Sequence, residues 1–170
     1  MNFVLTKITV ADEKQFKQDM QEAFQKGFED VYGEIDDVIL PEQDIEQSIQ
    51  GKGGIVYKAL VDDKMVGGAI VSIDDETQCN ELQFLYVKYG TQSSGIGKHI
   101  WDAIEQLHPE TKVWETCTPY FEKRNIHFYV NKCGFHITEF HRGEELIRNG
   151  GEPFIGDGGE GMFMMKKYIK

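Results

Sequence analysis

Residues 81–100, ELQFLYVKYGTQSSGIGKHI, carry the most specific local pattern in the chain. Residues 81–87 are rich in apolar and aromatic side chains and predict a strand, and apolar residues from Ile96 to Leu107 recur at helical spacing. Small residues between them let the backbone approach a ligand, and the first N–H groups of the helix point outward at its positive end. The stretch therefore predicts a strand, a phosphate-binding loop and a helix.

Two common phosphate-binding patterns do not fit this loop. A Walker loop that starts at Gly90 needs Lys and then Ser or Thr after Gly95, where Ile96 and Gly97 stand. A dinucleotide fingerprint that starts at Gly95 needs a further glycine at Ile100. The sequence thus excludes both patterns.

The rest of the chain alternates strand and helix patterns in the order β-α-α-β-β-β-α-β-α-β-β. Strands are expected at residues 3–10, 55–61, 65–73, 81–87, 112–118, 135–140 and 161–167, and helices at 12–31, 41–50, 96–107 and 122–133. The short turn Asp62-Asp63-Lys64 makes residues 55–73 an antiparallel hairpin. Because no repeat or linker appears, we expect one mixed α+β domain over residues 1–170.

Composition excludes several classes of protein. The 170 residues are 40% hydrophobic and carry a net charge of −11, which disfavours nucleic acid as a partner. No apolar run reaches the roughly 18 residues that a membrane span needs. Three cysteines and five histidines without ligand spacing indicate neither disulfides nor a metal site. A cytoplasmic protein is expected, and a homodimer is left open.

The segment Leu85-Tyr86-Val87 followed by Gln92-Ser93-Ser94-Gly95-Ile96-Gly97 resembles the acyl-coenzyme A loop of the GNAT acetyltransferase superfamily. The signature of that loop is Gln/Arg-x-x-Gly-x-Gly/Ala after a strand ending in a Leu-x-Val-like sequence. The order of elements matches along nearly the whole chain, and residues 125–129 with 132–135 look like the penultimate helix and the next strand. The resemblance implies a mostly antiparallel mixed sheet of about seven strands, flanked by about four helices and splayed at the acetyl-CoA slot.

The resemblance also implies a cofactor site. Backbone amides of residues 92–98 would hold the coenzyme pyrophosphate, and the strand at 85–87 would bond the pantetheine arm as an added strand. The family's coenzyme-contacting asparagine, seven residues before a tyrosine, is replaced here by Glu122. Asn125 is a substitute contact that could instead bond the end of the preceding strand or mark a later start of the helix. The implied cofactor-binding residues are Leu85, Tyr86, Val87, Gln92, Ser93, Ser94, Gly95, Ile96, Gly97, Lys98 and Asn125.

Two residues are candidates for acid–base chemistry. By the resemblance, Tyr129 would protonate the departing coenzyme thiolate, although it shares a helix face with apolar residues and could be a packed aromatic. Glu81 is the first candidate for the base that deprotonates the acceptor, or else a rim glutamate, with Glu115 second. A two-residue period would place Glu81, Gln83, Leu85 and Val87 on one face of their strand.

The implied function is transfer of an acetyl group from acetyl-CoA to a primary amine, by direct attack in a ternary complex. Residues 29–51 hold eight acidic residues and no Lys or Arg, which would attract a cationic amine such as a polyamine, an aminoglycoside or a lysine side chain. The same stretch could be a solvated surface, and the glycine-rich residues 141–161 could be a lid or a plain loop. Alternatives are a non-catalytic acyl-CoA sensor and an acidic protein-interaction module.

Overall fold

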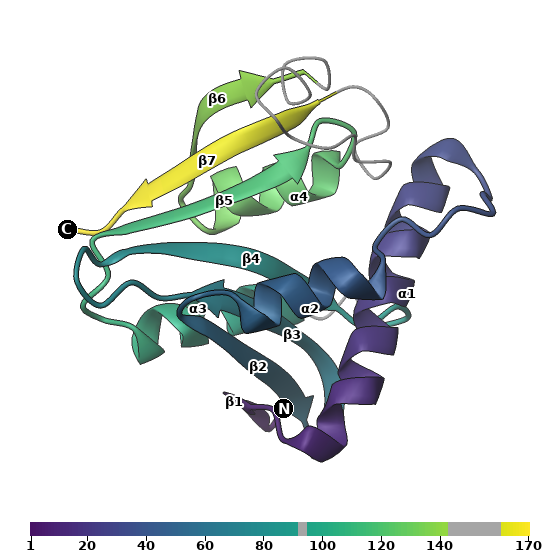
Figure 1. The fold of residues 1–170 in the computed structure, drawn as a ribbon, viewed down its shortest axis with the longest axis horizontal. Coiled ribbons are helices and arrows are strands. Elements are labelled where there is room, and N and C mark those ends of the chain that lie inside the picture. The colour runs from purple at the N-terminus through teal and green to yellow at the C-terminus, as the bar shows by residue number, and fades with distance from the viewer. Residues whose placement is uncertain (92–94, 143–160) are drawn as a thin grey trace.

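A computed structural model describes residues 1–91, 95–142 and 161–170. The strands in these residues form one sheet in the order β1-β2-β3-β4-β5-β7-β6 (Figure 1). The strands are β1 (Phe3–Lys7), β2 (Gly54–Val61), β3 (Lys64–Ser72), β4 (Cys79–Val87), β5 (Val113–Pro119), β6 (His136–His141) and β7 (Met162–Tyr168). The helices are η1 (Val10–Asp12, 3-10), α1 (Glu13–Tyr32), α2 (Glu42–Gln50), α3 (Ile96–Leu107), α4 (Lys123–His127) and the π-helix η3 (Phe128–Lys132). The mostly antiparallel, GNAT-like mixed sheet with four α-helices that the sequence predicts is confirmed.

The N-terminal half of the sheet is a meander of antiparallel strands. The expected hairpin is present, with β2 paired to β3 across a turn in which Asp62 and Asp63 have φ of 50° and 69°. Both turn residues therefore adopt the left-handed conformation that matches the twist of a two-residue hairpin. The first strand ends at Lys7, earlier than expected, because Val10–Asp12 forms the 3-10 turn that leads into α1.

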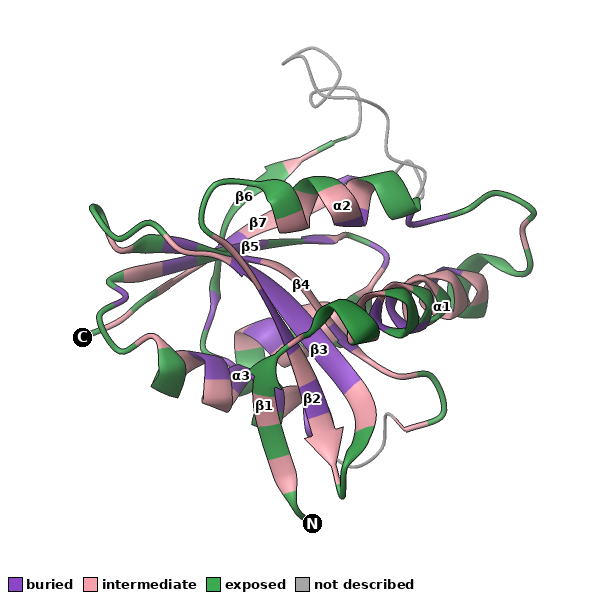
Figure 2. Cartoon of the chain, turned by 60° about the horizontal axis from the view of Figure 1, so that its bottom comes forward, coloured by how far each residue is buried: buried purple, intermediate pink, exposed green. Residues whose placement is uncertain are grey.

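The two faces of the sheet bury separate apolar clusters. On one face α3 packs Ile100, Trp101 and Ile104 against the sheet, and on the other α1 and α2 contribute Phe16, Met20 and Ile45. Gly68 of β3 lets α1 pack close to the sheet, because a Cβ at this position would lie 2.4 Å from Phe16 Cε2. Burial is therefore greatest in the central strands, while the edge strands β1 and β6 remain largely exposed (Figure 2).

The sheet separates between β4 and β5, which run parallel while every other described pair is antiparallel. Ladder pairing joins only residues 79–81 of β4 to 113–115 of β5. The Thr116 hydroxyl then donates to the Leu82 carbonyl at 3.0 Å, after which the strands diverge toward the end where α1 lies (Figure 1). The predicted splay of the sheet is confirmed.

A β-bulge at Gln83 corrects the expected facing of β4. Val71 of β3 pairs with Leu82 and Ile70 pairs with Phe84, so Gln83 is an extra residue in β4. The bulge reverses the alternation, and Leu85 packs with the α3 face while Phe84 packs with the α1 face. The expectation that Glu81, Gln83, Leu85 and Val87 share one face is therefore wrong.

The helix expected over residues 122–133 is also interrupted. After α4 the backbone widens into the π-helix, in which the N–H of Cys133 donates to the Phe128 carbonyl at 3.0 Å, five residues back. A π-turn holds one residue more than an α-helical turn, so the side chains beyond it rotate relative to a regular helix.

No helix among the described residues is both long and apolar enough to cross a membrane. Residues 143–160, most of the loop that the sequence leaves as a lid or a plain loop, lie outside the described residues.

Candidate active site

A cavity of about 620 Å³ lies where β4 and β5 have separated. Its walls come from α1, the end of β4, the start of α3 and the α4 region. Of the predicted cofactor residues, it is lined by Leu85, Tyr86, Val87, Gly95, Gly97, Lys98 and Asn125. Gln92, Ser93 and Ser94 lie outside the described residues, and Ile96, only 3% exposed, belongs to the α3 cluster rather than the lining.

The end of β4 offers backbone groups to this cavity. β3 pairs with β4 as far as Val87, but β5 makes no ladder with β4 beyond Glu81. In a strand, successive backbone groups point alternately to the two neighbours, so those of residues 85–87 that point away from β3 meet no strand. Such an edge accepts an extended ligand by forming ladder-like hydrogen bonds.

The start of α3 shapes the second wall. Gly95 precedes the helix in the left-handed conformation with φ of 70°, which a side chain would disfavour. A Cβ at Gly97 would lie 3.3 Å from Phe128 Cζ, so glycine lets the Phe128 ring approach the start of α3 closely. Lys98 forms an ion pair with Asp102 one turn later, and the hydrogen bond from this pair raises the pKa of Lys98.

The α4 region contributes the carboxylate of Glu122, at the position where the sequence departs from the GNAT pattern. Glu122 lines the cavity, and 15% of its side chain is exposed. Arg124 is 71% exposed, with Nη2 3.5 Å from Asp30 Oδ2 on α1 and Nε 3.9 Å from Glu122 Oε1. Burial raises the pKa of Glu122, with Arg124 opposing and Asp30 adding to the shift.

Tyr129, the predicted acid, is buried at 6% exposure. Its ring centroid lies 5.3 Å from that of Phe128 and 5.7 Å from that of Phe135, and burial raises the pKa of its phenol. Phe128 lines the cavity and Tyr129 is not among the lining residues. Tyr129 is therefore packed in the core next to the cavity wall.

Glu81, the predicted base, lies in a different place. It pairs with Glu115 at the last ladder position, in a small cavity of about 150 Å³ that Lys52, Ser72 and Asp74 also line. Burial, and then the charge of Glu115, raise the pKa of Glu81. The structure thus brings Glu81 and Glu115 together but separates them from the cavity that holds the predicted cofactor residues.

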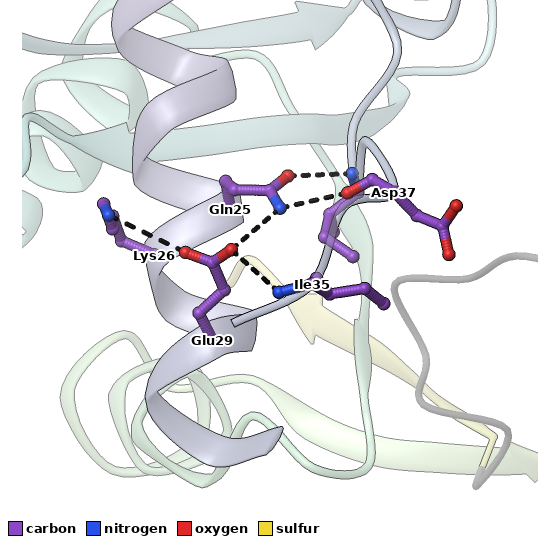
Figure 3. Close-up of polar contacts among 6 residues, drawn as sticks. Gln25, Lys26, Glu29, Ile35 and Asp37 are labelled. Atoms are coloured by element: carbon purple, nitrogen blue, oxygen red, sulfur yellow. Dashed lines mark hydrogen bonds and ion pairs between the residues drawn. The ribbon is translucent and has the colours of Figure 1, made fainter. Parts of the chain in front are cut away.

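The acidic stretch begins on α1, where two side chains hold the loop toward α2 (Figure 3). Gln25 accepts from the Ile39 N–H at 3.0 Å and donates to the Asp37 carbonyl at 3.0 Å. Glu29 accepts from the Ile35 N–H at 3.3 Å and from the Gln25 amide at 3.2 Å. Backbone contacts therefore fix this loop, while Asp36 and Asp37 remain exposed.

Cys117 and Cys133 both lie outside the lining of the large cavity. Cys133 is buried, and burial raises the pKa of its thiol to about 12, so little of it is thiolate at neutral pH. Cys117 is exposed. The described residues hold no group of three or more His, Cys, Asp or Glu side chains arranged for a metal ion.

Comparison with known proteins assigns the family. The model of the acetyltransferase (GNAT) family matches residues 15–135, and the chain therefore belongs to this family. It is 43% identical over 168 residues to the uncharacterized protein YrkN of Bacillus subtilis (strain 168). The aligned part covers 94% of this chain and 90% of that protein. The GNAT acetyltransferase identified from the sequence is confirmed, and with it acetyl-CoA, the cosubstrate of enzymes of this family.

Solved structures share the fold at low sequence identity. The ribosomal-protein-S18-alanine N-acetyltransferase of Escherichia coli aligns with a TM-score of 0.74 and 15% identity, covering 99% of this chain and 95% of that one. A GNAT family acetyltransferase from Elizabethkingia anophelis with acetyl-CoA bound aligns with a TM-score of 0.71 and 16% identity, covering 99% of both chains. An acetyltransferase of Bacillus subtilis in complex with CoA aligns with a TM-score of 0.69 and 21% identity, again over 99% of both.

Proposed function

We propose that the chain transfers an acetyl group from acetyl-CoA to a primary amine by direct attack in a ternary complex. The observation that carries this proposal is the separation of β4 from β5 beside the cavity of about 620 Å³. A sheet that opens next to a glycine-bearing helix start offers both ladder groups and outward N–H groups to one extended ligand. Family membership supplies the reaction class.

The lining residues divide between two parts of the cofactor. The backbone at Leu85 and Val87 would bond the amide groups of the pantetheine arm, and the start of α3 at Gly95 and Gly97 would hold the pyrophosphate. Lys98, next to Gly97, lines the same wall and gives the phosphates a cation, and Asn125 lines the α4 side. The acyl group would then lie in the splay, beside the α1 wall.

Direct attack is favoured over an acyl-enzyme intermediate. Transfer through cysteine needs a thiolate beside the acyl group, and neither Cys117 nor Cys133 lines the cavity. The amine nitrogen would attack the thioester carbon. The coenzyme would leave as a thiolate and take up a proton to become the thiol. The sequence predicts that Tyr129 gives this proton, whereas Glu81, the base that the sequence predicts, lines the separate small cavity.

Replacement of Tyr129 by Phe tests the acid. If the phenol gives the proton, kcat should fall by about 100-fold, because general acids contribute about 10² to 10⁴. The dissociation constant of acetyl-CoA, measured by calorimetry, should stay within about twofold because the tyrosine does not line the cavity. An unchanged kcat would leave Tyr129 as a core aromatic only.

The function itself is tested by melting and by thiol release. Acetyl-CoA at about 100 times its dissociation constant should stabilise the fold by about 2.7 kcal/mol, which raises Tm. Free thiol should then appear when spermidine, L-lysine, kanamycin or a peptide with N-terminal alanine is added. The first three amines test whether the acidic stretch of residues 29–51 attracts a cationic acceptor. The peptide, whose N-terminal alanine has an uncharged side chain, is the comparison.

A sensor that binds acyl-CoA without turnover is the second candidate. The observation that favours it is that neither Tyr129 nor Glu81 lines the large cavity. A rise in Tm with acetyl-CoA but no thiol release with any of the four amines would support the sensor. No rise in Tm at millimolar acetyl-CoA would contradict both candidates and favour an acidic interaction module.

A further inference from the structure

We propose that Glu122 is the general base that takes a proton from the acceptor ammonium group. This inference deepens the proposed function and depends on it. An ammonium group cannot attack a thioester until it loses a proton, so a carboxylate must reach the acceptor nitrogen directly or through one water. Glu122 is one of two carboxylates, with Asp30, on the wall of the cavity that also presents Leu85, Gly95 and Gly97 to the cofactor.

The position of the Glu122 carboxylate is fixed against α1. A Cβ at position 27 would lie 3.1 Å from Glu122 Oε2. Any residue other than glycine there would therefore press on the Glu122 carboxylate. Glycine in a helix interior is unfavourable, and Gly27 lies well inside α1, which spans Glu13–Tyr32. The missing side chain thus opens a place for the Glu122 carboxylate against α1.

This placement puts Glu122 at the acceptor side. The start of α3, the end of β4 and α1 with Gly27 and Asp30 all line the cavity, so a cofactor held by the first two would leave the α1 wall to the acceptor. An amine that approaches the acyl group therefore passes the α1 wall. Glu81 cannot serve from its own small cavity, which shares no lining residue with the large one.

The charges around Glu122 suit a proton acceptor. Asp30 faces it from α1 and Arg124 from α4, while Lys98 and Lys132 line the same cavity farther along α3 and the π-helix. The guanidinium of Arg124 is mostly exposed, and its Nε lies 3.9 Å from Glu122, which is too long for a strong hydrogen bond. Burial therefore outweighs Arg124 and raises the pKa of Glu122, which makes the carboxylate a stronger base.

The step balances without another reactant. Glu122 takes one proton from R–NH₃⁺, and the free electron pair of the amine forms the C–N bond at the thioester carbon. The C–S bond breaks, the coenzyme sulfur takes a proton from the Tyr129 phenol, the phenol regains the second proton of the nitrogen, and Glu122 returns its own proton to water. The products are the acetylated amine, free coenzyme thiol and one proton.

The main test is Glu122→Gln in the full chain, assayed for thiol release with the best acceptor among spermidine, L-lysine, kanamycin and the alanine peptide. At pH 7, kcat should fall by about 100-fold. The kcat of the variant should keep rising with pH toward the pKa of the amine itself, about 10 for a lysine-like group, whereas the wild type should reach its plateau earlier. Glu110→Gln, at an exposed position outside both cavities, is the matched control and should leave kcat unchanged.

A second variant moves the carboxylate without removing it. Gly27→Ala places a methyl group against Glu122 Oε2, so kcat should fall by about 10-fold while the acidic limb of the pH profile remains. Far-ultraviolet circular dichroism checks that α1 is intact, and calorimetry with coenzyme A checks that the cofactor still binds.

The outcomes separate this inference from the proposed function. An active wild type whose Glu122→Gln variant keeps both kcat and the pH profile overturns the role of Glu122 alone. A raised KM for the acceptor or for acetyl-CoA at unchanged kcat also overturns it, because Glu122 would then only bind. A wild type that neither binds acetyl-CoA nor releases thiol contradicts the proposed function instead.

Discussion

At the closed end of the β4–β5 junction, residues 79–81 pair with 113–115, whereas at the open end the same two strands have no ladder between them. Side chains reinforce the closed end: Asn80 donates to the Thr111 hydroxyl at 2.7 Å and accepts from the Asp74 N–H at 2.8 Å. The open end instead borders the large cavity. The closed end thus supplies stability, and the open end leaves its polar groups to a ligand.

The largest expected effect is at the closed end. Trp114 pairs with Asn80 in the ladder, is 1% exposed, and its ring centroid lies 5.3 Å from that of Trp101. Trp114→Ala should lower the free energy of unfolding by about 3–5 kcal/mol, because it removes a large buried aromatic and leaves a hole. Urea denaturation measures this, and a loss under about 1 kcal/mol would contradict a structural role for this end.

Gly97→Val is the matching change at the open end. Gly97 and Phe128 both line the cavity, and the added side chain would press on the Phe128 ring and fill space at the start of α3, so the affinity for coenzyme A should fall by about 100-fold, or about 2.7 kcal/mol. Calorimetry measures the affinity. The free energy of unfolding should change by less than about 1 kcal/mol, since valine is only a moderately poor helix residue. Unchanged affinity would place the cofactor elsewhere.

The smallest expected effect is electrostatic. Because burial raises the pKa of Glu122, the folded state favours its protonated form. The stability from this preference is present below the unfolded pKa and is lost as pH rises through the folded pKa. Glu122→Gln should therefore be slightly more stable than wild type at pH 7, by less than about 1 kcal/mol after solvent screening. Melting curves at pH 7 and pH 4 should show this advantage only at pH 7.

Much of the fold follows from local patterns in the sequence. The hairpin turn at Asp62 and Asp63, the glycine-bearing loop before α3 and the order of elements all depend on residues close in the chain. The predicted cofactor residues of β4 and α3 accordingly meet at one cavity, apart from Ile96 and the residues outside the described part.

The facing of the acid–base candidates could not be predicted in the same way. The bulge at Gln83 and the π-helix at Phe128–Lys132 each insert one residue without changing the apolar character of their segment. A two-residue period continued through Gln83 predicts the wrong residues on the same face of β4 as Glu81. The role of Glu122 depends on Gly27, almost a hundred residues earlier, and only the tertiary packing of α1 shows that contact. A signal was nevertheless present, because Glu122 stands where the family keeps an asparagine.

The loop between α1 and α2 is held by its backbone and not by its acidic side chains. Gln25 and Glu29 bind this backbone through atoms that every amino acid except proline shares. The outward side chains at Asp36 and Asp37 can therefore be exchanged without breaking these hydrogen bonds. The surface charge of this segment can vary while α1 and α2 keep their places.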